Sequence, residues 1–574
     1  MQPSPVETLG YVRRSVGPRC FFLPCCLLCG LGACSESSGG SRPAPVLTNL
    51  EISATALHGR GELWALEVPE SGEGSMDLNG DGDADDSVPL LYDLSDGSLT
   101  NLSLALGMFP PILKVGEVLV AWGVPEVDQG SSDLNGDGDV DDLVLHVHDV
   151  RSGVTTNTQL ALALLQPAIG VGVVAFAVPE SAQGGADLDG DGTTNGSVLH
   201  VYDSRTLVTT NAMRNVTSEI TFHDHAFGFT TDEPSAGMDL NRDGDETDRH
   251  VFEMYDLPLG GIEQVTLAIR GMPLAVNADD WFLLVDEDEM GSDLNGDLDT
   301  NEGVIHEVHP HQHTFQSLGL SSLGSFSSTA DGADLAFHVQ EVDGFDRNGD
   351  GDFQDLLVVQ YSSARAELLD PGLATRSAFA FVEGSLGFLV DESGQGQDLN
   401  DDGDQDDDVL HVLDRSSGTA VDVGLDALAL RSTGGWLVFW RWEGSAGEDW
   451  NDDGDQDDVV TFYWDPLLRL TTNTGLASVG SPAAASAGWI LLAAHEFGEQ
   501  DDLNSDGDTN DEVYVLHDVV TRQNTNLGVA VSAPGAGLTS DGRGVLLVSE
   551  VGQGADLNGD GDELDSVLHR LDLL

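Results

Sequence analysis

The chain is poor in basic residues, in cysteine and in aromatic side chains. It has 574 residues, with 22 lysines and arginines against 100 aspartates and glutamates, so its formal net charge is −78. A surface of that charge repels nucleic acid, which excludes nucleic-acid binding as a main function. All five cysteines lie in the first 34 residues, so the rest of the chain cannot form a disulfide or a thiolate metal site. Aromatics make up 6% and glycine occupies 69 positions, which favours short strands and tight turns over a helical bundle.

Residues 1–33 are predicted to be a signal peptide. Arginines precede an apolar run at residues 20–31, which is too short to span a bilayer as a stable helix. The run ends in Leu-Gly-Ala-Cys at residues 31–34 and resembles the lipobox of bacterial lipoproteins. The resemblance implies that Cys34 is lipidated and, because Ser35 follows it, that the protein is sorted to the outer membrane. An ordinary secretory signal cleaved near Ala33 is the alternative.

The chain after Cys34 divides into a tether and a repeat region. Residues 34–45 are rich in serine, glycine and proline and are predicted to form a flexible tether. From residue 46 to residue 574, one acidic segment, first seen as DLNGDGD at residues 77–83, recurs ten times at spacings of 51 to 56 residues. This regularity predicts that each repeat is one supersecondary unit stacked on its neighbours.

The second repeat shows how one unit is built. Short apolar or β-branched segments at 111–115, 118–124, 144–148 and 155–161 predict four strands, and a polar loop separates the second from the third. Four short strands in about 50 residues are typical of a β-propeller blade. The pattern resembles the TolB-type blade, with the acidic loop added to it.

The two ends of the repeat region predict how it closes. The Thr-Asn of the fourth strand, as at residues 100–101, also occurs at 48–49, before the first repeat. The last repeat ends after its third strand, at 566–571. We therefore expect residues 46–52 to supply the missing strand, which removes two exposed edges. The predicted fold is all-β, a single closed β-propeller ring of ten four-stranded blades; two smaller propellers are the alternative.

The acidic loops predict calcium sites. Oxygen-bearing side chains alternate at positions 1, 3 and 5 of each loop, and a glycine usually follows at position 6. Such a loop wraps around a hard cation, and Ca²⁺ takes six to eight oxygen ligands. The loops resemble those of EF-hands, dockerins and integrin-type FG-GAP propellers. They depart from EF-hands at position 12, which is apolar here, so a further ligand must come from elsewhere. Mg²⁺ fits less well because it keeps its waters.

The candidate calcium ligands occupy five loop positions, counted from the first aspartate. Position 1 holds Asp77, Asp133, Asp187, Asp239, Asp293, Asp346, Asp398, Asp449, Asp502 and Asp556. Position 3 holds Asn79, Asn135, Asp189, Asn241, Asn295, Asn348, Asn400, Asn451, Asn504 and Asn558. Position 5 holds Asp81, Asp137, Asp191, Asp243, Asp297, Asp350, Asp402, Asp453, Asp506 and Asp560. Position 7 holds Asp83, Asp139, Asp245, Asp299, Asp352, Asp404, Asp455, Asp508 and Asp562. Position 10 holds Asp86, Asp142, Asp248, Glu302, Asp355, Asp407, Asp458, Asp511 and Asp565.

An acid precedes each loop by five to seven residues, and we expect it to bind the ion or to accept hydrogen bonds from the loop. These acids are Glu70, Glu126, Glu180, Asp232, Asp286, Glu341, Asp391, Glu443, Glu496 and Glu550. The third and fifth loops are expected to bind most weakly. The third has Thr193 at position 7 and Gly196 at position 10, and the fifth has Leu298 where the others have glycine.

The sequence contains no G-x-S-x-G, no H-E-x-x-H and no phosphate-binding glycine loop before a helix, and we predict no catalytic residues. The absence of these motifs does not exclude an enzyme, because propeller enzymes gather their residues from distant blades. Histidine recurs at position 14 of five repeats, at His146, His200, His306, His411 and His569. A shared blade consensus explains this better than a functional ring of histidines.

These features predict a calcium-binding cell-envelope lipoprotein of the bacterial outer membrane, facing the periplasm or the cell surface. It would contact the membrane through the Cys34 lipid and act as a binding or scaffolding module for a protein or polysaccharide ligand, with structural calcium. The rival hypothesis is a hydrolase or lyase that acts on an envelope or extracellular polymer, with its site at the central channel. The blades look interchangeable, which favours the first hypothesis. A propeller with no ligand beyond Ca²⁺ is a third alternative.

Overall fold

The computed structural model describes residues 44–573, except for 108–110, 271–274, 277–279, 297, 313, 323–327, 333, 342–345, 377–378, 479–483 and 487. The predicted signal peptide, Cys34 and residues 34–43 of the predicted tether therefore lie outside the described residues. Residues 44–574 form one compact unit. None of the helices in the described ranges is long and apolar enough to cross a membrane.

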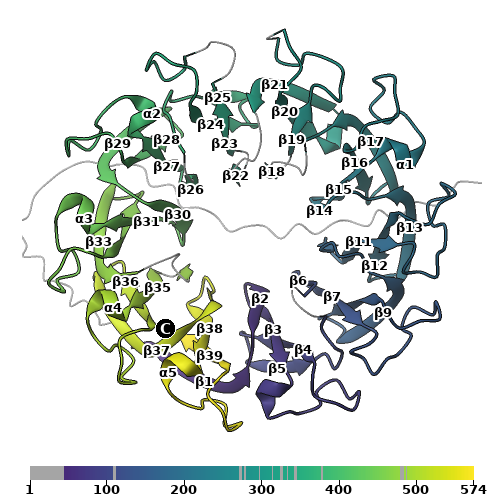
Figure 1. The fold of residues 1–574 in the computed structure, drawn as a ribbon, viewed down its shortest axis with the longest axis horizontal. Helices are drawn as coiled ribbons and strands as arrows, with labels where there is room; N and C mark the ends of the chain where they lie inside the picture. The colour runs from purple at the N-terminus through teal and green to yellow at the C-terminus, as the bar shows by residue number, and fades with distance from the viewer. Residues whose placement is uncertain are drawn as a thin grey trace, which may run out of the picture. The chain divides into compact units, whose positions relative to one another are not determined.

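The second repeat folds into one antiparallel sheet of four strands in chain order (Figure 1). Its strands are β6 (Leu113–Val115), β7 (Leu119–Pro125), β8 (Leu143–Asp149) and β9 (Val154–Ala161). They match the four predicted segments to within a few residues. Six of the seven residues of β7 are buried, because this strand has neighbours on both sides and on both faces. This is the strand order of a β-propeller blade, and the predicted all-β class is confirmed.

In the described residues, eight sheets have four strands and one has seven. The sheet of the first repeat contains β2 (Ala56–Arg60), β3 (Leu63–Pro69), β4 (Ser87–Asp93) and β5 (Ser98–Asn101). The sheets of the third, fourth and fifth repeats contain, in turn, β10 (Ala168–Ile169), β11 (Val173–Pro179), β12 (Ser197–Asp203) and β13 (Val208–Asn215); β14 (Thr221–His223), β15 (Ala226–Thr231), β16 (Val251–Asp256) and β17 (Gly261–Ala268); and β18 (Ala275–Val276), β19 (Trp281–Asp286), β20 (Gly303–His309) and β21 (Thr314–Ser322). The sheets of the sixth, seventh and eighth repeats contain, in turn, β22 (Ser328–Asp331), β23 (Asp334–Gln340), β24 (Leu356–Ser362) and β25 (Glu367–Leu369); β26 (Phe379–Val382), β27 (Ser385–Asp391), β28 (Asp408–Asp414) and β29 (Thr419–Asp426); and β30 (Ala429–Thr433), β31 (Trp436–Trp442), β32 (Val459–Asp465) and β33 (Leu470–Ala477).

The seven-stranded sheet joins the ninth repeat, the tenth repeat and the start of the chain. It contains β34 (Ala484–Ser486), β35 (Trp489–His495), β36 (Glu512–Asp518), β37 (Gln523–Leu538), β38 (Arg543–Ser549), β39 (Ser566–Asp572) and β1 (Val46–Ser53). The first part of β37 pairs with β36 and its last part pairs with β38, so one long strand serves two repeats. The predicted pairing of residues 46–52 with the last repeat is present, because β1 runs antiparallel to β39 with Val46 opposite Asp572 (Figure 1).

The Thr-Asn motif forms a bulge in the fourth strand. In β9, the side-chain amide of Asn157 donates to the backbone carbonyl of Leu134 in the acidic loop at 2.9 Å. Its Oδ1 accepts a hydrogen bond from the backbone N–H of Gln159, which has a φ of +58°. The motif therefore ties the fourth strand to the loop of its own repeat.

Hydrophobic cores lie between sheets of neighbouring repeats. One core contains Leu145 and Val147 of β8 together with Val174 and Phe176 of β11. The first and last repeats also share a core, which includes Leu66 of β3 and Leu568 of β39. The sheet of the first repeat therefore packs against the sheet of the last repeat in the same way as the sheets of consecutive repeats pack against each other.

Among the described residues, compact turns that were not expected from the sequence precede acidic loops. Several of these turns form one-turn helices at the end of the second strand: η1 (Ser71–Glu73), α1 (Glu233–Ala236), α2 (Glu392–Gln395), α3 (Glu443–Ala446), α4 (Glu496–Glu499) and α5 (Glu550–Gln553). The remaining short helix, η2 (Pro310–Gln312), joins β20 to β21.

Candidate metal centres

The acidic loops are held by hydrogen bonds from their own backbone. In the first loop, the carboxylate of Asp77 accepts from the N–H of Gly80 at 2.6 Å and of Gly82 at 3.2 Å. Asn79 Oδ1 accepts from the N–H of Asp81 at 3.1 Å. Gly82 has a φ of +112°, which explains glycine at position 6. Aspartate and asparagine favour such turns because their side chains reach the backbone two or three residues on.

A buried glutamate anchors the loop from below. Glu70 is fully buried, and its Oε1 accepts from the N–H groups of Leu78 and Asn79. Its Oε2 accepts from the N–H of Asp86 at 3.4 Å. The predicted role as a hydrogen-bond acceptor is therefore confirmed in this repeat.

In three repeats the prediction of the anchoring acid is wrong, and the anchor is the residue that follows the predicted one. The predicted residues are Asp232, Asp286 and Asp391, and the structure has Glu233, Glu287 and Glu392 as the anchors. Asp391 illustrates the physical reason. Its carboxylate caps α2 by accepting from the N–H of Ser393 and pairs with Arg376, so it is already engaged. The longer side chain of Glu392, one residue on, reaches the loop.

The anchoring glutamate and the loop acids gather within reach of one ion. The ligand atoms in each group lie within 4.8 Å of one another. Four such groups are Glu70, Asp83 and Asp86; Glu126, Asp139 and Asp142; Glu180, Asp187 and Asp189; and Glu496, Asp506, Asp508 and Asp511. The structure thus brings acids of positions 7 and 10 beside the anchor, whereas the sequence alone placed the anchor only at the loop's entry. Asp297, the predicted ligand at position 5 of the fifth loop, lies outside the described residues.

Burial, with a smaller contribution from this crowding, raises the pKa of several position-10 carboxyls. Burial raises the pKa of Asp86 to about 6, and the nearby charges of Asp128, Asp81 and Glu70 add to the increase against a lowering by Asn79. The same cause, burial first, raises the pKa of Asp142, Asp407 and Asp458 to about 6 and of Asp248 to about 7. The raised pKa values mean that burial and mutual repulsion make the ionised form of these carboxyls unfavourable. A divalent cation bound among them would remove this cost by compensating the carboxylate charges.

Two anchors also have an unpaired oxygen. Glu287 is fully buried and Glu341 is 2% exposed. Within the described part of the chain, no hydrogen-bond donor reaches Oε2 of either residue. A buried carboxylate oxygen without a partner is costly, and an ion in the loop would satisfy it. The side chains that could bind the ion offer only oxygen atoms as ligands, which fits Ca²⁺.

In seven loops, the asparagine at position 3 links the loop to the following repeat. In the first loop, the Asn79 amide donates to Asp86 at 2.9 Å and to the backbone carbonyl of Asp128, in the second repeat, at 3.2 Å. The equivalent links join Asn135 to Ala182, Asn241 to Glu289, Asn348 to Gly394, Asn451 to Gly498, Asn504 to Gly552 and Asn558 to Gly72. The loops therefore contact the junctions between sheets. Asp189 of the third loop carries no amide and cannot make this bond.

The third and fifth loops differ as the sequence indicates. Gly196 leaves the third loop without a position-10 carboxylate, although its N–H still donates to Glu180 at 3.0 Å. In the fifth loop, Leu298 takes a φ of +85° and is 91% exposed. A leucine in this left-handed conformation is strained and gains no packing in return.

The five shared histidines are structural. They are buried, and each Nδ1 lies 3.0 to 3.2 Å from a backbone carbonyl of its own strand, which assigns the proton to Nδ1. Burial lowers the pKa of His146 to about 4, so this imidazole is neutral at physiological pH. The interpretation as a blade consensus agrees with this geometry.

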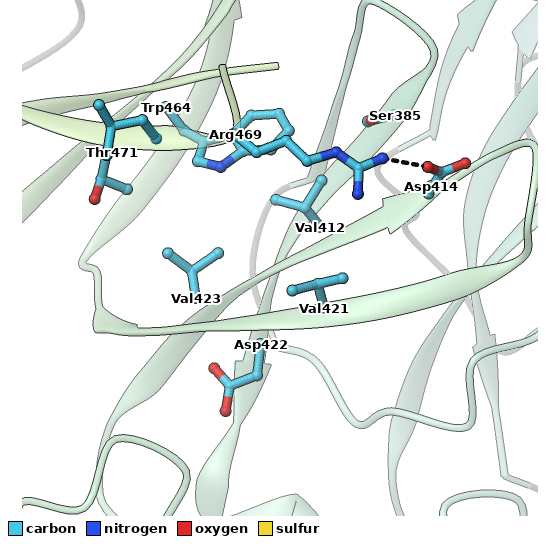
Figure 2. Close-up of a pocket in the computed structure, with 10 residues that line it drawn as sticks. Ser385, Val412, Asp414, Val421, Asp422, Val423, Trp464, Arg469 and Thr471 are labelled. Atoms are coloured by element: carbon cyan, nitrogen blue, oxygen red, sulfur yellow. Dashed lines mark hydrogen bonds and ion pairs between the residues drawn. The ribbon is translucent and has the colours of Figure 1, made fainter. Parts of the chain in front are cut away.

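A pocket of about 300 Å³ lies between the sheets of the seventh and eighth repeats (Figure 2). Val412 and Trp464 are among its apolar wall residues, and Arg469 crosses it to pair with Asp414 at 2.6 Å. The hydroxyl of Ser416 and the other donors around Asp414 lower the pKa of this carboxyl to about 2. Asp414 therefore stays ionised and paired with Arg469.

No family model matches the chain, and neither does any curated protein. Several solved structures are similar to it. The β-propeller domain of the Trilobed protease from Pyrococcus furiosus is 11% identical with a TM-score of 0.26, covering 63% of this chain and 95% of that domain. TolB from Acinetobacter baumannii is 9% identical with a TM-score of 0.23, covering 66% and 79%. An acylaminoacyl peptidase from Pyrococcus horikoshii is 11% identical with a TM-score of 0.25, and this chain spans 50% of its length while 62% of this chain is covered. The fold assignment rests on the strand order of this chain itself.

Proposed function

We propose that the chain is a calcium-binding lipoprotein of the bacterial outer membrane, anchored through Cys34 and facing the periplasm or the cell surface. Residues 46–574 would form one closed β-propeller of ten blades that acts as a binding or scaffolding module. The observation that carries the calcium assignment is the repeated grouping of loop carboxylates around a buried glutamate, as at Glu70, Asp83 and Asp86. Such a group is stable as a set of carboxylates only with a counter-ion.

Three contacts between the two ends of the unit support a closed ring. β1 supplies the fourth strand beside β39, the first and last repeats share a core, and Asn558 of the last loop donates to the Gly72 carbonyl of the first repeat at 2.7 Å. The last of these is the same link that joins neighbouring repeats elsewhere. The first and last blades would therefore meet as any other pair does.

The calcium would be structural and would act between blades. The residues that would hold it are those of loop positions 1, 3, 5, 7 and 10, and the ion would supply positive charge to them. Position 3 also bonds to the next repeat, so an ion that orders the loop also orders the junction. At ~1 mM Ca²⁺ and a Kd of ~0.1 mM, each site adds ~1.4 kcal/mol to the folded state. Several such sites together match the stability of an ordinary domain.

Thermal unfolding in calcium and in chelator tests the structural role. We expect a melting temperature many degrees higher in millimolar Ca²⁺ than in EDTA, with a smaller effect of Mg²⁺ at the same concentration. Mass spectrometry of metals should find several calcium ions per chain after dialysis at low Ca²⁺. Equal melting temperatures in Ca²⁺ and EDTA would contradict structural calcium.

Mass spectrometry of the mature N-terminus tests the anchor. The expected species begins at Cys34 and carries the mass of attached lipid, and a Cys34→Ser variant should lose it and leave the membrane fraction. A mature chain that begins at Ser35, or one that retains Met1, would contradict lipidation.

Affinity purification from native envelopes tests the scaffolding role. The same partner should be retained in Ca²⁺ and lost in EDTA, because unloaded loops loosen the junctions between blades. A chain that retains the same proteins and polysaccharides with and without Ca²⁺ would argue against a calcium-dependent binding module.

A further inference from the structure

A second group of metal-ligand side chains lies at the opposite end of the fifth sheet from its acidic loop. The loop joins the end of β19 to the start of β20, where Asp286 pairs with Gly303. Asp280 immediately precedes β19, and His309 ends β20 at the other end of the same ladder. Ligand atoms of Asp280, Glu307 and His309 lie within 4.8 Å of one another. His309 Nδ1 is 2.5 Å from Asp280 Oδ1, and His309 Nε2 is 3.8 Å from Glu307 Oε2.

Both carboxylates of this group are buried. Asp280 is 6% exposed and Glu307 is 1% exposed. Glu307 Oε2 accepts from the hydroxyl of Tyr361 at 2.8 Å and from the amide of Gln316 at 2.6 Å. Among the residues that the structure describes, no hydrogen-bond donor reaches Glu307 Oε1. One oxygen of a deeply buried, firmly positioned carboxylate is therefore left for another partner.

The group is built by two repeats. Tyr361 belongs to β24 of the sixth repeat, and its ring packs edge-on against Phe282 of β19, with ring centres 6.1 Å apart. The phenol is held between Glu307 and Gln316 and fixes the carboxylate's orientation. An outer contact that orients a ligand in this way is typical of metal sites.

We propose that Asp280, Glu307 and His309 bind one divalent transition-metal ion, with Zn²⁺ as the best match. One imidazole and two carboxylates suit Zn²⁺ and its neighbours, whereas Ca²⁺ takes oxygen ligands only. An ion bound at His309 Nδ1 would displace the proton that this nitrogen shares with Asp280, and the proton would be released to water. Glu307 Oε1, which accepts no hydrogen bond among the described residues, is the oxygen of that carboxylate left to bind the ion. This site is chemically distinct from the calcium loops and goes beyond the proposed structural role of Ca²⁺.

The histidine also gives the site a route to solvent. His309 is 22% exposed in its side chain and lines a cavity of about 220 Å³ between the fourth and fifth sheets. Arg242 and Glu263 line the same cavity, so it is polar. A hydrated ion can therefore approach from the side of His309 while the two carboxylates stay buried.

Metal titration in saturating Ca²⁺ tests the proposal. The full-length protein, loaded with millimolar Ca²⁺ to fill the oxygen loops, is titrated with Zn²⁺ by calorimetry and with Co²⁺ by visible absorption. We expect one Zn²⁺ per chain bound more tightly than any other. His309→Ala and Glu307→Gln should each weaken it by at least about tenfold, the lower end of what even the loss of an outer contact costs. Tyr361→Phe, which keeps the ring, should weaken it without removing a ligand.

His225→Ala is the matched control. His225 also pairs with carboxylates, Asp224 at 2.5 Å and Asp256 at 3.4 Å, at the corresponding end of the fourth sheet. The His225→Ala variant should bind Zn²⁺ at the tight site as the unaltered protein does. Anomalous scattering at the zinc edge from crystals of the unaltered protein provides a second measurement that needs no variant. A peak away from His309, or Zn²⁺ affinity that His309→Ala leaves unchanged, would overturn the proposal.

Discussion

The side-chain amide of Asn49 donates a 2.8 Å hydrogen bond to the backbone carbonyl of Leu557, 508 positions further along the chain. Asn157 makes the same bond to Leu134, only 23 positions away, because a fourth strand normally follows the loop of its own repeat. Asn49 therefore performs for the tenth repeat what other asparagines perform within theirs. This contact joins the two ends of the repeat region.

Deleting residues 46–52 should damage the protein far more than a short terminal truncation normally does. The deletion removes β1 and exposes the edge of β39, which is then free to pair with another chain. We expect a melting temperature lower by several degrees and the appearance of oligomers in light scattering. A variant that lacks only residues 44 and 45 is the control. Monomers that melt like the intact chain would show that β1 is dispensable.

Glu126→Gln should destabilise the protein by about 2 kcal/mol, because the buried N–H groups of Leu134 and Asn135 lose a charged acceptor. The side-chain NH₂ of the new glutamine would also face the N–H of Asp142, so two hydrogen-bond donors would oppose each other. Chemical denaturation at fixed Ca²⁺ measures the change. Glu117→Gln, at an exposed position, is the matched control and should change stability little. Equal stabilities of the two variants would contradict the anchoring role.

Leu298→Gly should stabilise the protein or leave it unchanged, although it removes a large side chain. The φ of Leu298 is +85°, and relief of this strain is worth about 1 kcal/mol. The fifth loop should also bind Ca²⁺ more tightly. Leu564→Gly is the control, because Leu564 is likewise exposed, at 78%, but has no positive φ. If both variants lose stability alike in thermal melts, then Leu298 is not strained.

Stability of the calcium-free protein should fall as pH rises from about 4 to about 7. Burial raises the pKa of Asp86 to about 6 and of Asp248 to about 7 above the usual value of 3.8, so the folded state holds these protons more tightly. That contribution is present at low pH and is lost as pH passes through the folded pKa. Ca²⁺ should reverse the trend, because it needs the ionised carboxylates. Melts at pH 5 and pH 8, with EDTA and with Ca²⁺, measure both slopes; parallel slopes would contradict the prediction.

Sequence reasoning predicted the strands and loops well because their signals are local. The β-branched runs of a buried strand such as 118–124, the alternating oxygens of a loop and the glycine at position 6 each act within a few residues. Ten copies of one pattern strengthened every assignment. The pairing of residues 46–52 with the last repeat also followed, because a spare fourth strand at one end matches a missing one at the other.

The anchoring acid was predicted less well because adjacency in the sequence does not settle which side chain is buried. At the start of α2, Asp391 and Glu392 are both acids near the loop, and only the packed structure shows that the first caps the helix while the second reaches the loop. The same limit applies to the links between repeats. From the sequence, Asn79 is predicted to be a calcium ligand. The hydrogen bond from its amide to the Asp128 carbonyl could not be predicted, because it depends on the packing of two sheets against each other.

The sequence by itself determined the repeat, its four strands, its acidic loops and the origin of the last strand, since these depend on short-range periodicity and turn chemistry. The tertiary structure decided which glutamate lies beneath each loop, which loops link to the next sheet, and that Asp280, Glu307 and His309 come together with Tyr361 of the following repeat. These contacts depend on how side chains of separate strands are buried against one another. Burial is a property of the packed unit, and no single repeat carries enough information to specify it.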